Sequence, residues 1–303
     1  MLTQRTLKRS ISCIGIGLHT GDKVHMTMHP APEDSGITFV RTDISGRPVI
    51  KASLENVVHT RRATTLGVNG ITLSTVEHLL SAFTGLGVDN VMVEVDSVEI
   101  PIMDGSAAPF VFLIKTAGLK KQNRPKKFYV IEQSIFVSDQ DKYLSLEPAQ
   151  ELVIDFSINF DHPLLESQSY QVNLSRKIFE KEISRARTFG FLQEVEYLKK
   201  NGLARGGSLD NAIVIDHFRV LNEGGLRYED EFVRHKILDL IGDVSLMGSP
   251  VIGRFKAHKS GHTLNHSLLA RLMETPEAWR RMTAADLFQP TEFYQPEAAR
   301  VTA

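Results

Sequence analysis

The stretch from Glu229 to Met247, EDEFVRHKILDLIGDVSLM, predicts a long helix around which the rest of the chain can pack. Its apolar residues recur at helical spacing and form one stripe: Val233, Ile237, Leu240, Ile241 and Val244. His235, Asp239 and Asp243 are spaced i, i+4 and i+8, so they form a ridge roughly opposite that stripe. A histidine and an aspartate four residues apart can chelate a metal ion, although a surface ion pair gives the same pattern.

A second amphipathic helix is predicted at about residues 74–86, where glycines end the apolar pattern. Its apolar stripe consists of four residues: Val76, Leu79, Leu80 and Phe83. His78 points roughly opposite this stripe, although a lone histidine on a helix is usually a surface residue. Glu77 stands three residues after Ser74, so it can also be read as part of a capping box. The two helices together offer a set of ligands for an open zinc site with a carboxylate beside it.

Three further segments carry candidate functional residues. His262 ends Lys259-Ser260-Gly261-His262, where a turn histidine can donate a proton or simply flank a helix cap. Phe189 and Phe191 flank a glycine and can either stack on a base or pack as a strand. Residues 202–208 are rich in glycine but lack the ending of a phosphate-binding P-loop, so we expect a mobile loop.

Composition restricts the class of protein. The chain has 303 residues, with 35 Lys+Arg against 36 Asp+Glu, so no basic excess favours nucleic acid or an anionic membrane. No apolar run is long enough for stable membrane insertion, and the first ten residues lack a signal peptide's apolar core. The single cysteine, Cys13, excludes an internal disulfide. These features predict a cytoplasmic protein.

The order of predicted elements indicates an α+β fold. Strands and helices occur in both halves without strict βα alternation, which argues against a doubly wound parallel sheet. We expect two α+β domains, residues 1–122 and 128–285, joined by a polar linker at 123–127. A single strand is expected at 128–137, and a flexible tail at 286–303.

Several motifs in this order carry a family resemblance. They are Thr75-Val76-Glu77-His78-Leu79-Leu80-Ser81-Ala82, Pro101-Ile102-Met103-Asp104-Gly105-Ser106, Ser184 to Phe191, Val220-Leu221-Asn222-Glu223, His235 to Asp243 and Lys259 to His262. With them the chain closely resembles the UDP-3-O-acyl-N-acetylglucosamine deacetylases (the LpxC family), zinc amidohydrolases of lipid A biosynthesis in Gram-negative bacteria. The resemblance extends from Gln4 to about Trp279.

The resemblance implies a fold and a cofactor. The two domains would share a β-α-α-β sandwich topology, with helices packed between two sheets and the active site at the domain junction. A small insert at about 56–68 and a βαβ insert at about 191–215 would close the site, the second forming a passage for the acyl chain. One Zn²⁺ per chain is implied, and Fe²⁺ is possible in the cell because His and Asp ligands accept either ion.

The resemblance also implies a role for each matching residue. His78, His235 and Asp239 match the zinc ligands. Glu77 matches the general base, His262 the general acid, Asp243 the carboxylate that orients and charges His262, and Thr188 a hydroxyl that stabilises the oxyanion. Six positions match substrate contacts: Lys236, Phe189, Phe160, Phe191, Lys259 and His19.

The implied substrate is UDP-3-O-(3-hydroxyacyl)-N-acetylglucosamine, and we expect a monomer whose tail is open to a protease. Arg205 departs from the family pattern, since a charged head in the acyl passage would either reach out to water or narrow the passage. The basic stretch 58–63 is a second departure, in the insert that would form a wall of the pocket. Two rival readings stay open: an amidohydrolase for another N-acetyl sugar, and a catalytically silent binding protein.

Overall fold

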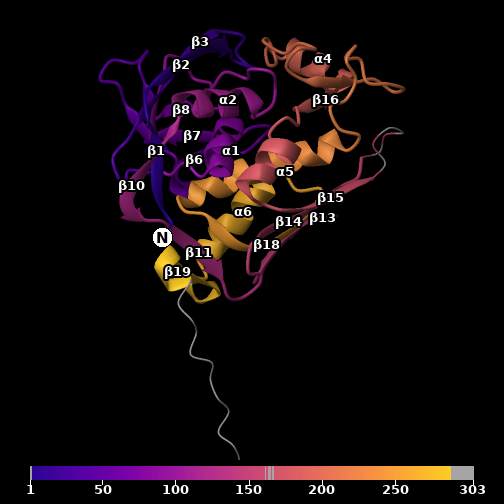
Figure 1. The fold of residues 1–303 in the computed structure, drawn as a ribbon. Helices are drawn as coiled ribbons and strands as arrows, with labels where there is room; N and C mark the ends of the chain where they lie inside the picture. Colours follow the sequence, from indigo (N-terminus) through magenta and orange to yellow (C-terminus); the bar gives the residue numbers. More distant parts are fainter. Residues whose placement is uncertain (1, 161, 163–164, 166, 288–303) are drawn as a thin grey trace, which may run out of the picture.

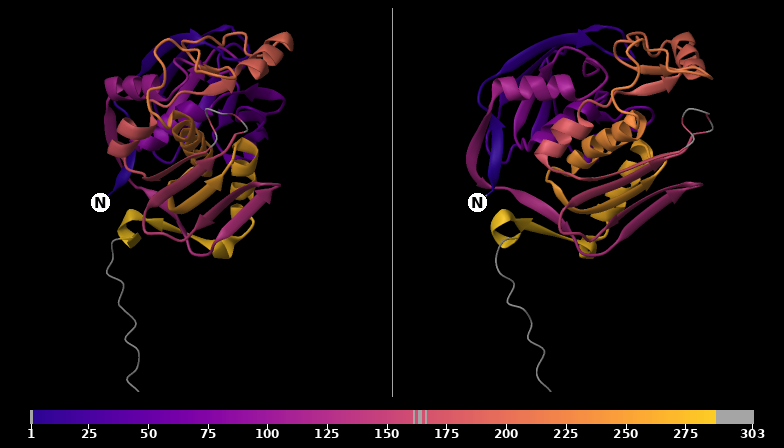
Figure 2. Two further views of the ribbon diagram at one scale, coloured as in Figure 1. Left: turned by 90° about the vertical axis from the view of Figure 1, so that its right-hand side faces the viewer. Right: turned by 45° about the vertical axis from the view of Figure 1, so that its right-hand side comes forward.

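The computed structural model describes residues 2–160, 162, 165 and 167–287 and consists of two sheets with helices between them (Figure 1). The layering is clearest in the right-hand view of Figure 2, where the sheet of the first half and the sheet of the second half enclose the helices. The predicted α+β class, with helices between two sheets, is confirmed.

The first sheet has five strands in the order β2-β3-β9-β4-β5. They are β2 (Ile11–Ile16), β3 (Lys23–Pro30), β4 (Ile37–Arg41), β5 (Val49–Lys51) and β9 (Val91–Val95). In β3, Val24, Met26 and Met28 are buried while the residues between them are at least partly exposed, which is the alternation of a sheet with one face on the core. Helices α1 (Glu77–Leu86) and α2 (Ala108–Ala117) belong to this half.

The second sheet has seven strands, with the central path β12-β13-β18-β11-β19 and β14 and β15 alongside. They are β11 (Lys127–Ile131), β12 (Ile135–Asp139), β13 (Lys142–Glu147), β14 (Leu152–Ile158), β15 (Gln168–Asn173), β18 (Val251–His258) and β19 (Trp279–Thr283). Helices α5 (Glu231–Val244) and α6 (His262–Met273) cover its inner face. Since α5 also packs on α1, it is buried on nearly every side.

The contact between α1 and α5 fixes the position of the site. Gly242 on α5 meets the backbone of Glu77 on α1 so closely that a Cβ at Gly242 would lie 2.2 Å from the carbonyl oxygen of Glu77. Only glycine permits this approach, because any larger residue would push the two helices apart. The polar ridge of α5 is thereby held against the start of α1.

Two small units flank this core. Strands β6 (Val57–His59), β7 (Thr65–Val68) and β8 (Ile71–Leu73) form a three-stranded sheet in the first half. In the second half, β16 (Phe189–Phe191) and β17 (Ile213–Ile215) pair in parallel across α4 (Leu192–Lys200). The unit of β16, α4 and β17 stands out from the sandwich at the upper right of Figure 1.

The predicted linker at 123–127 is wrong. Residues Leu119–Pro125 form β10, which pairs antiparallel with β1 (Thr3–Leu7), and only Lys126 separates it from β11. The strand was missed because β10 lies in a two-stranded ribbon with most of its side chains exposed, so its polar sequence looks like a linker. The single strand expected at 128–137 is instead split into β11 and β12.

The remaining short elements complete the chain. They are α3 (Arg176–Ile178), a π-helical turn (Phe179–Ile183), the 3₁₀ turns Leu54–Asn56, Ser245–Met247 and Pro276–Ala278, and α7 (Ala284–Leu287). Of the flexible tail expected at 286–303, the first two residues belong to α7 and the rest lie outside the described residues. No helix in the described part of the chain combines the length and the apolar character that a membrane span requires.

Candidate active site

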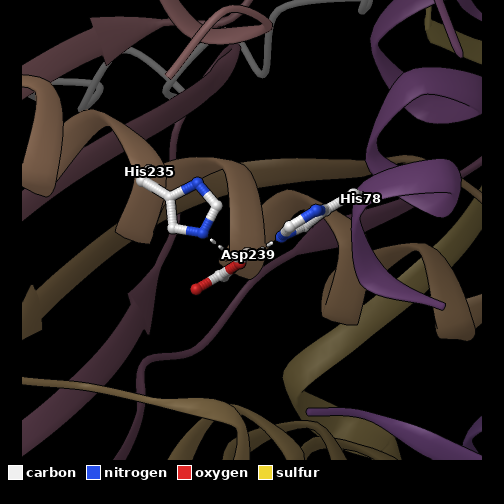
Figure 3. Close-up of side chains that lie close together, drawn as sticks. All are labelled: His78, His235 and Asp239. Carbon is white, nitrogen blue, oxygen red and sulfur yellow. Dashed lines mark ion pairs between the residues drawn. The ribbon is translucent and has the colours of Figure 1, made fainter. Parts of the chain in front are cut away.

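The three predicted metal ligands lie together at the α1–α5 contact (Figure 3). Nε2 of His78 is 3.6 Å and Nε2 of His235 is 3.4 Å from the same carboxylate oxygen of Asp239. One donor atom from each residue lies within 4.8 Å of the others. All three side chains are buried, so these residues are not the surface histidine or the surface ion pair that the sequence alone also allowed.

The donor set fits a divalent transition metal. His235 donates a hydrogen bond from Nδ1 to the carbonyl oxygen of Ala186 at 3.0 Å, which leaves the lone pair of Nε2 facing the cluster. Burial lowers the pKa of His235 to about 4, so this ring is neutral, as a ligand must be. Burial opposes charge on Asp239, but Lys236, 2.9 Å from its second oxygen, and the nearby histidines together outweigh it and hold the pKa of Asp239 well below its usual range.

Glu77 lies beside the cluster and takes no part in a capping box. The helix begins at Glu77 itself, and Ser74 bonds the hydroxyl of Thr65 instead of capping the helix. The Glu77 carboxylate accepts a hydrogen bond from the backbone N–H of Thr64 at 3.1 Å and lies 3.7 Å from Nε2 of His262. Burial raises the pKa of Glu77, although the nearby His262 counteracts this, and the carboxylate is thereby a stronger base than usual.

His262 forms a buried pair with Asp243, 2.8 Å from Nδ1 to the carboxylate. Asp243 also accepts hydrogen bonds from Asn265 at 2.8 Å and from the hydroxyl of Thr64 at 2.5 Å. Burial alone would lower the pKa of His262, but Asp243, with Glu77 and Asp239 behind it, raises it to about 9. The imidazole is therefore a cation at neutral pH.

Thr64 and Asn265 are site residues that the sequence did not reveal. Asn265 follows His262 by three residues on α6, so helical spacing could have suggested that both reach the same partner. Thr64 comes from the segment between β6 and β7 and contacts Glu77, 13 residues later, and Asp243, 179 residues later. No local pattern marks such a residue.

Most of the predicted site residues line a single pocket of about 940 Å³. Twelve of the thirteen predicted site residues line it: His19, Glu77, His78, Phe160, Thr188, Phe189, Phe191, His235, Lys236, Asp239, Lys259 and His262. Asp243 does not line the pocket and lies behind His262. The pocket is contributed by both halves of the chain, because His78 comes from the first half and His235 from the second.

The three predicted aromatic contacts pack on one another. Phe160 meets Phe189 edge-on at 5.8 Å and Phe191 at 5.6 Å between ring centroids. Phe189 and Phe191 form β16, so they lie on the same side of the strand and wall the pocket together. The strand reading is confirmed and the rings also line the pocket, whereas stacking on a base stays a prediction.

Thr188 and Lys259 are held in place by neighbouring groups. The N–H of Thr188 donates to Gly105 and its carbonyl accepts from Ile213, both at 2.8 Å, which fixes the backbone from which the hydroxyl extends. The ammonium of Lys259 lies 2.6 Å from the carboxylate of Asp141, in the turn between β12 and β13.

The inserts contribute to the wall in different ways. Residues 60–63 of the basic stretch line the pocket, whereas Arg205 is exposed and does not. The head of Arg205 therefore reaches away from the pocket instead of narrowing it. The loop 202–208, expected to be mobile, forms two backbone hydrogen bonds to the first half of the chain. The N–H of Arg205 donates to the carbonyl of His19, and the N–H of Gly206 donates to the carbonyl of Leu18.

Comparison with known proteins identifies the family. A family model described as UDP-3-O-acyl N-acetylglycosamine deacetylase matches residues 4–274. A UDP-3-O-acyl-N-acetylglucosamine deacetylase of Hahella chejuensis is 50% identical over 302 residues, which cover 99% of this chain and 100% of the relative. One of Saccharophagus degradans is 54% identical over 288 residues, with 94% and 95% covered. The chain thus belongs to the UDP-3-O-acyl-N-acetylglucosamine deacetylase family.

Proposed function

We propose that this enzyme hydrolyses the acetamide of UDP-3-O-(3-hydroxyacyl)-N-acetylglucosamine to the free amine and acetate, the committed step of lipid A biosynthesis. The single observation that carries the proposal is one pocket that holds a buried His-His-Asp cluster with a carboxylate on one side and an imidazolium beside it. Amide hydrolysis needs a base for the water and an acid for the leaving amine, and this pocket supplies both.

His78, His235 and Asp239 would hold the metal, which we propose to be Zn²⁺, with Fe²⁺ as the alternative in the cell. When bound, such an ion lowers the pKa of water and polarises a carbonyl oxygen. The three protein ligands leave coordination positions open, as in catalytic rather than structural zinc sites. Lys236 keeps Asp239 ionised and so keeps the ligand set ready.

Glu77 would take the proton from the water that attacks the acetamide carbonyl carbon. Thr188 would donate its hydroxyl to the oxygen on which negative charge develops, and a preorganised donor of this kind can contribute about 3 kcal/mol. His262 would then protonate the nitrogen as the C–N bond breaks. The released products are acetate and the amine of the sugar.

The shape of the pocket supports a substrate with one apolar and one anionic part. Phe191, Val195 and Leu198 project from one face of the α4 region, at i, i+4 and i+7, and line the pocket together with Leu18. We propose that the acyl chain lies along this apolar wall. Besides Lys236 at the His-His-Asp cluster, four cationic residues line the pocket and would face the diphosphate: Arg61, Arg62, Lys142 and Lys259.

That the chain acts as a monomer stays a prediction. Protease attack on the tail stays a prediction, because residues 288–303 lie outside the described residues.

The pH dependence tests the role of the Asp243–His262 pair. Since Glu77 must be ionised and His262 protonated to act, activity should be full between the pKa values of these two groups and fall as the pH rises through about 9. Because Asp243 raises this pKa, Asp243→Asn should move the alkaline limb of kcat to lower pH by about one to three units. The measurement is kcat from pH 5 to about 10.

The matched control is Asp155→Asn, because Asp155 does not line the pocket and should leave the limb in place. An alkaline limb that stays where it is in Asp243→Asn would show that His262 is not the group titrating there.

A further inference from the structure

We infer that Glu99 is a positioning residue that holds the apolar wall of the pocket in register with the catalytic helix α1. The inference rests on the proposed function, because the apolar wall is where the acyl chain would lie. Glu99 itself does not line the pocket and is 1% exposed, so it would act through the residues that it binds.

Glu99 is a buried carboxylate whose bonds all go to two short segments. It accepts hydrogen bonds from the N–H of His19 at 3.0 Å, the N–H of Thr20 at 3.0 Å and the hydroxyl of Thr20 at 3.1 Å. Oε1, which accepts from His19, also accepts from the hydroxyl of Thr75 at 3.0 Å. These hydrogen bonds from backbone and hydroxyl groups stabilise its charge.

The Thr75 side of this link leads to the catalytic base. Thr75 lines the pocket and precedes Glu77 by two residues. Its φ is +60°, a left-handed conformation that a β-branched residue adopts only where its surroundings hold it. Glu99 supplies one such hold, and its neighbours Val98 and Ile100 bond the backbone of Ser74 at 2.8 and 3.0 Å.

The His19 side of the link leads to the insert. The carbonyl oxygens of Leu18 and His19 accept hydrogen bonds from the N–H groups of Gly206 and Arg205 at 3.1 and 3.3 Å. A Cβ at Gly206 would lie 2.2 Å from the carbonyl oxygen of Gly17, so the loop of the insert rests directly on this turn. Figure 1 shows the insert above the core, with the first sheet beside it.

Glu99 therefore connects the start of α1 to the turn on which the insert rests. Leu18, on that turn, and Val195 and Leu198, on the insert, line the same pocket. Without the hydrogen bonds to Glu99, the turn at Leu18 and His19 can move, and these apolar side chains move with it relative to Glu77. A long acyl chain then loses apolar contacts at a fixed distance from the base. For a short acyl chain that does not reach the apolar wall, kcat/KM should stay nearly the same.

The test is the dependence of kcat/KM on acyl length in Glu99→Gln. Glutamine keeps the shape but replaces one acceptor oxygen by an NH₂ group that faces other donors. The two substrates carry 3-hydroxyacyl chains of about 4 and about 14 carbons on the same UDP-sugar, so the difference between them reports the apolar contact alone. We expect kcat/KM for the long chain to fall about tenfold or more, and for the short chain about twofold or less.

The control is Glu94→Gln, since Glu94 lies on β9 and, within the described residues, its side chain pairs only with the exposed Arg47 and the half-buried His29, neither of which lines the pocket. If Glu99→Gln does not fold, Gly206→Ala takes its place, because the added methyl group must lift the loop from Gly17. Its own control is Gly224→Ala, where a Cβ would meet no atom within 4 Å.

The outcomes separate the inference from the proposed function. A selective loss with the long chain supports the positioning role of Glu99. Equal losses with both chains, or no loss, in a variant that folds would overturn it while leaving the proposed function standing. Failure of the unaltered enzyme to release acetate from either substrate overturns the proposed function and this inference with it.

Discussion

Glu77→Gln should lower kcat by about 100- to 10,000-fold, the range that a positioned general base contributes. Glutamine retains the shape and can still accept the hydrogen bond from the N–H of Thr64, so the fold at the start of α1 should persist. What the variant loses is the ability to take a proton from water. The measurement is the initial rate of acetate release at saturating substrate, together with the metal content of the same sample.

The metal content of Glu77→Gln shows whether activity is lost because the base is missing or because the metal ion is missing. Since Glu77 is not among the three clustered ligands, the variant should retain about as much metal as the unaltered enzyme. A variant that keeps both its metal and its full activity would show that another group activates the water.

His235→Ala is expected to have the second large effect, by removing the metal. It deletes one of three protein ligands, and even the loss of an outer-shell partner of a ligand costs about 10- to 100-fold in affinity. We therefore expect a fall in metal affinity of more than about 100-fold and loss of acetate release. Metal per chain, measured after dialysis against a competing chelator, gives the affinity directly.

The matched control for this variant is His266→Ala, because His266 lies on α6 and does not line the pocket. Unchanged metal in His235→Ala would contradict the assignment of the site.

The parts of the site that the sequence could predict are those that follow helical spacing. His235, Asp239 and Asp243 lie four residues apart, and the structure places the first two in the cluster with His78 and the third behind His262. The periodicity did not show that this ridge would be buried, because burial comes from the packing of α1 against α5. That packing depends on the close approach of Gly242 to the backbone of Glu77, which no pattern in the sequence predicts.

The parts that the sequence could not predict depend on contacts between distant segments. Thr64 reaches Asp243 across 179 residues, and Glu99 reaches the turn at His19 across 80. Neither residue belongs to a periodic pattern, so nothing local distinguishes it from an ordinary polar residue. The strand β10 was missed for a related reason. Its side chains are mostly polar and exposed, and nothing in their pattern indicates the pairing with β1 that makes it a strand.

The central claim is metal-dependent release of acetate, and one measurement tests it most directly. Acetate would be assayed from UDP-3-O-(3-hydroxyacyl)-N-acetylglucosamine before chelation, after chelation and after the return of about one equivalent of Zn²⁺ per chain. We expect activity to disappear with the chelator and to return with the ion. No release from folded, metal-loaded protein would contradict the account and favour either another N-acetyl sugar as substrate or a silent binding protein.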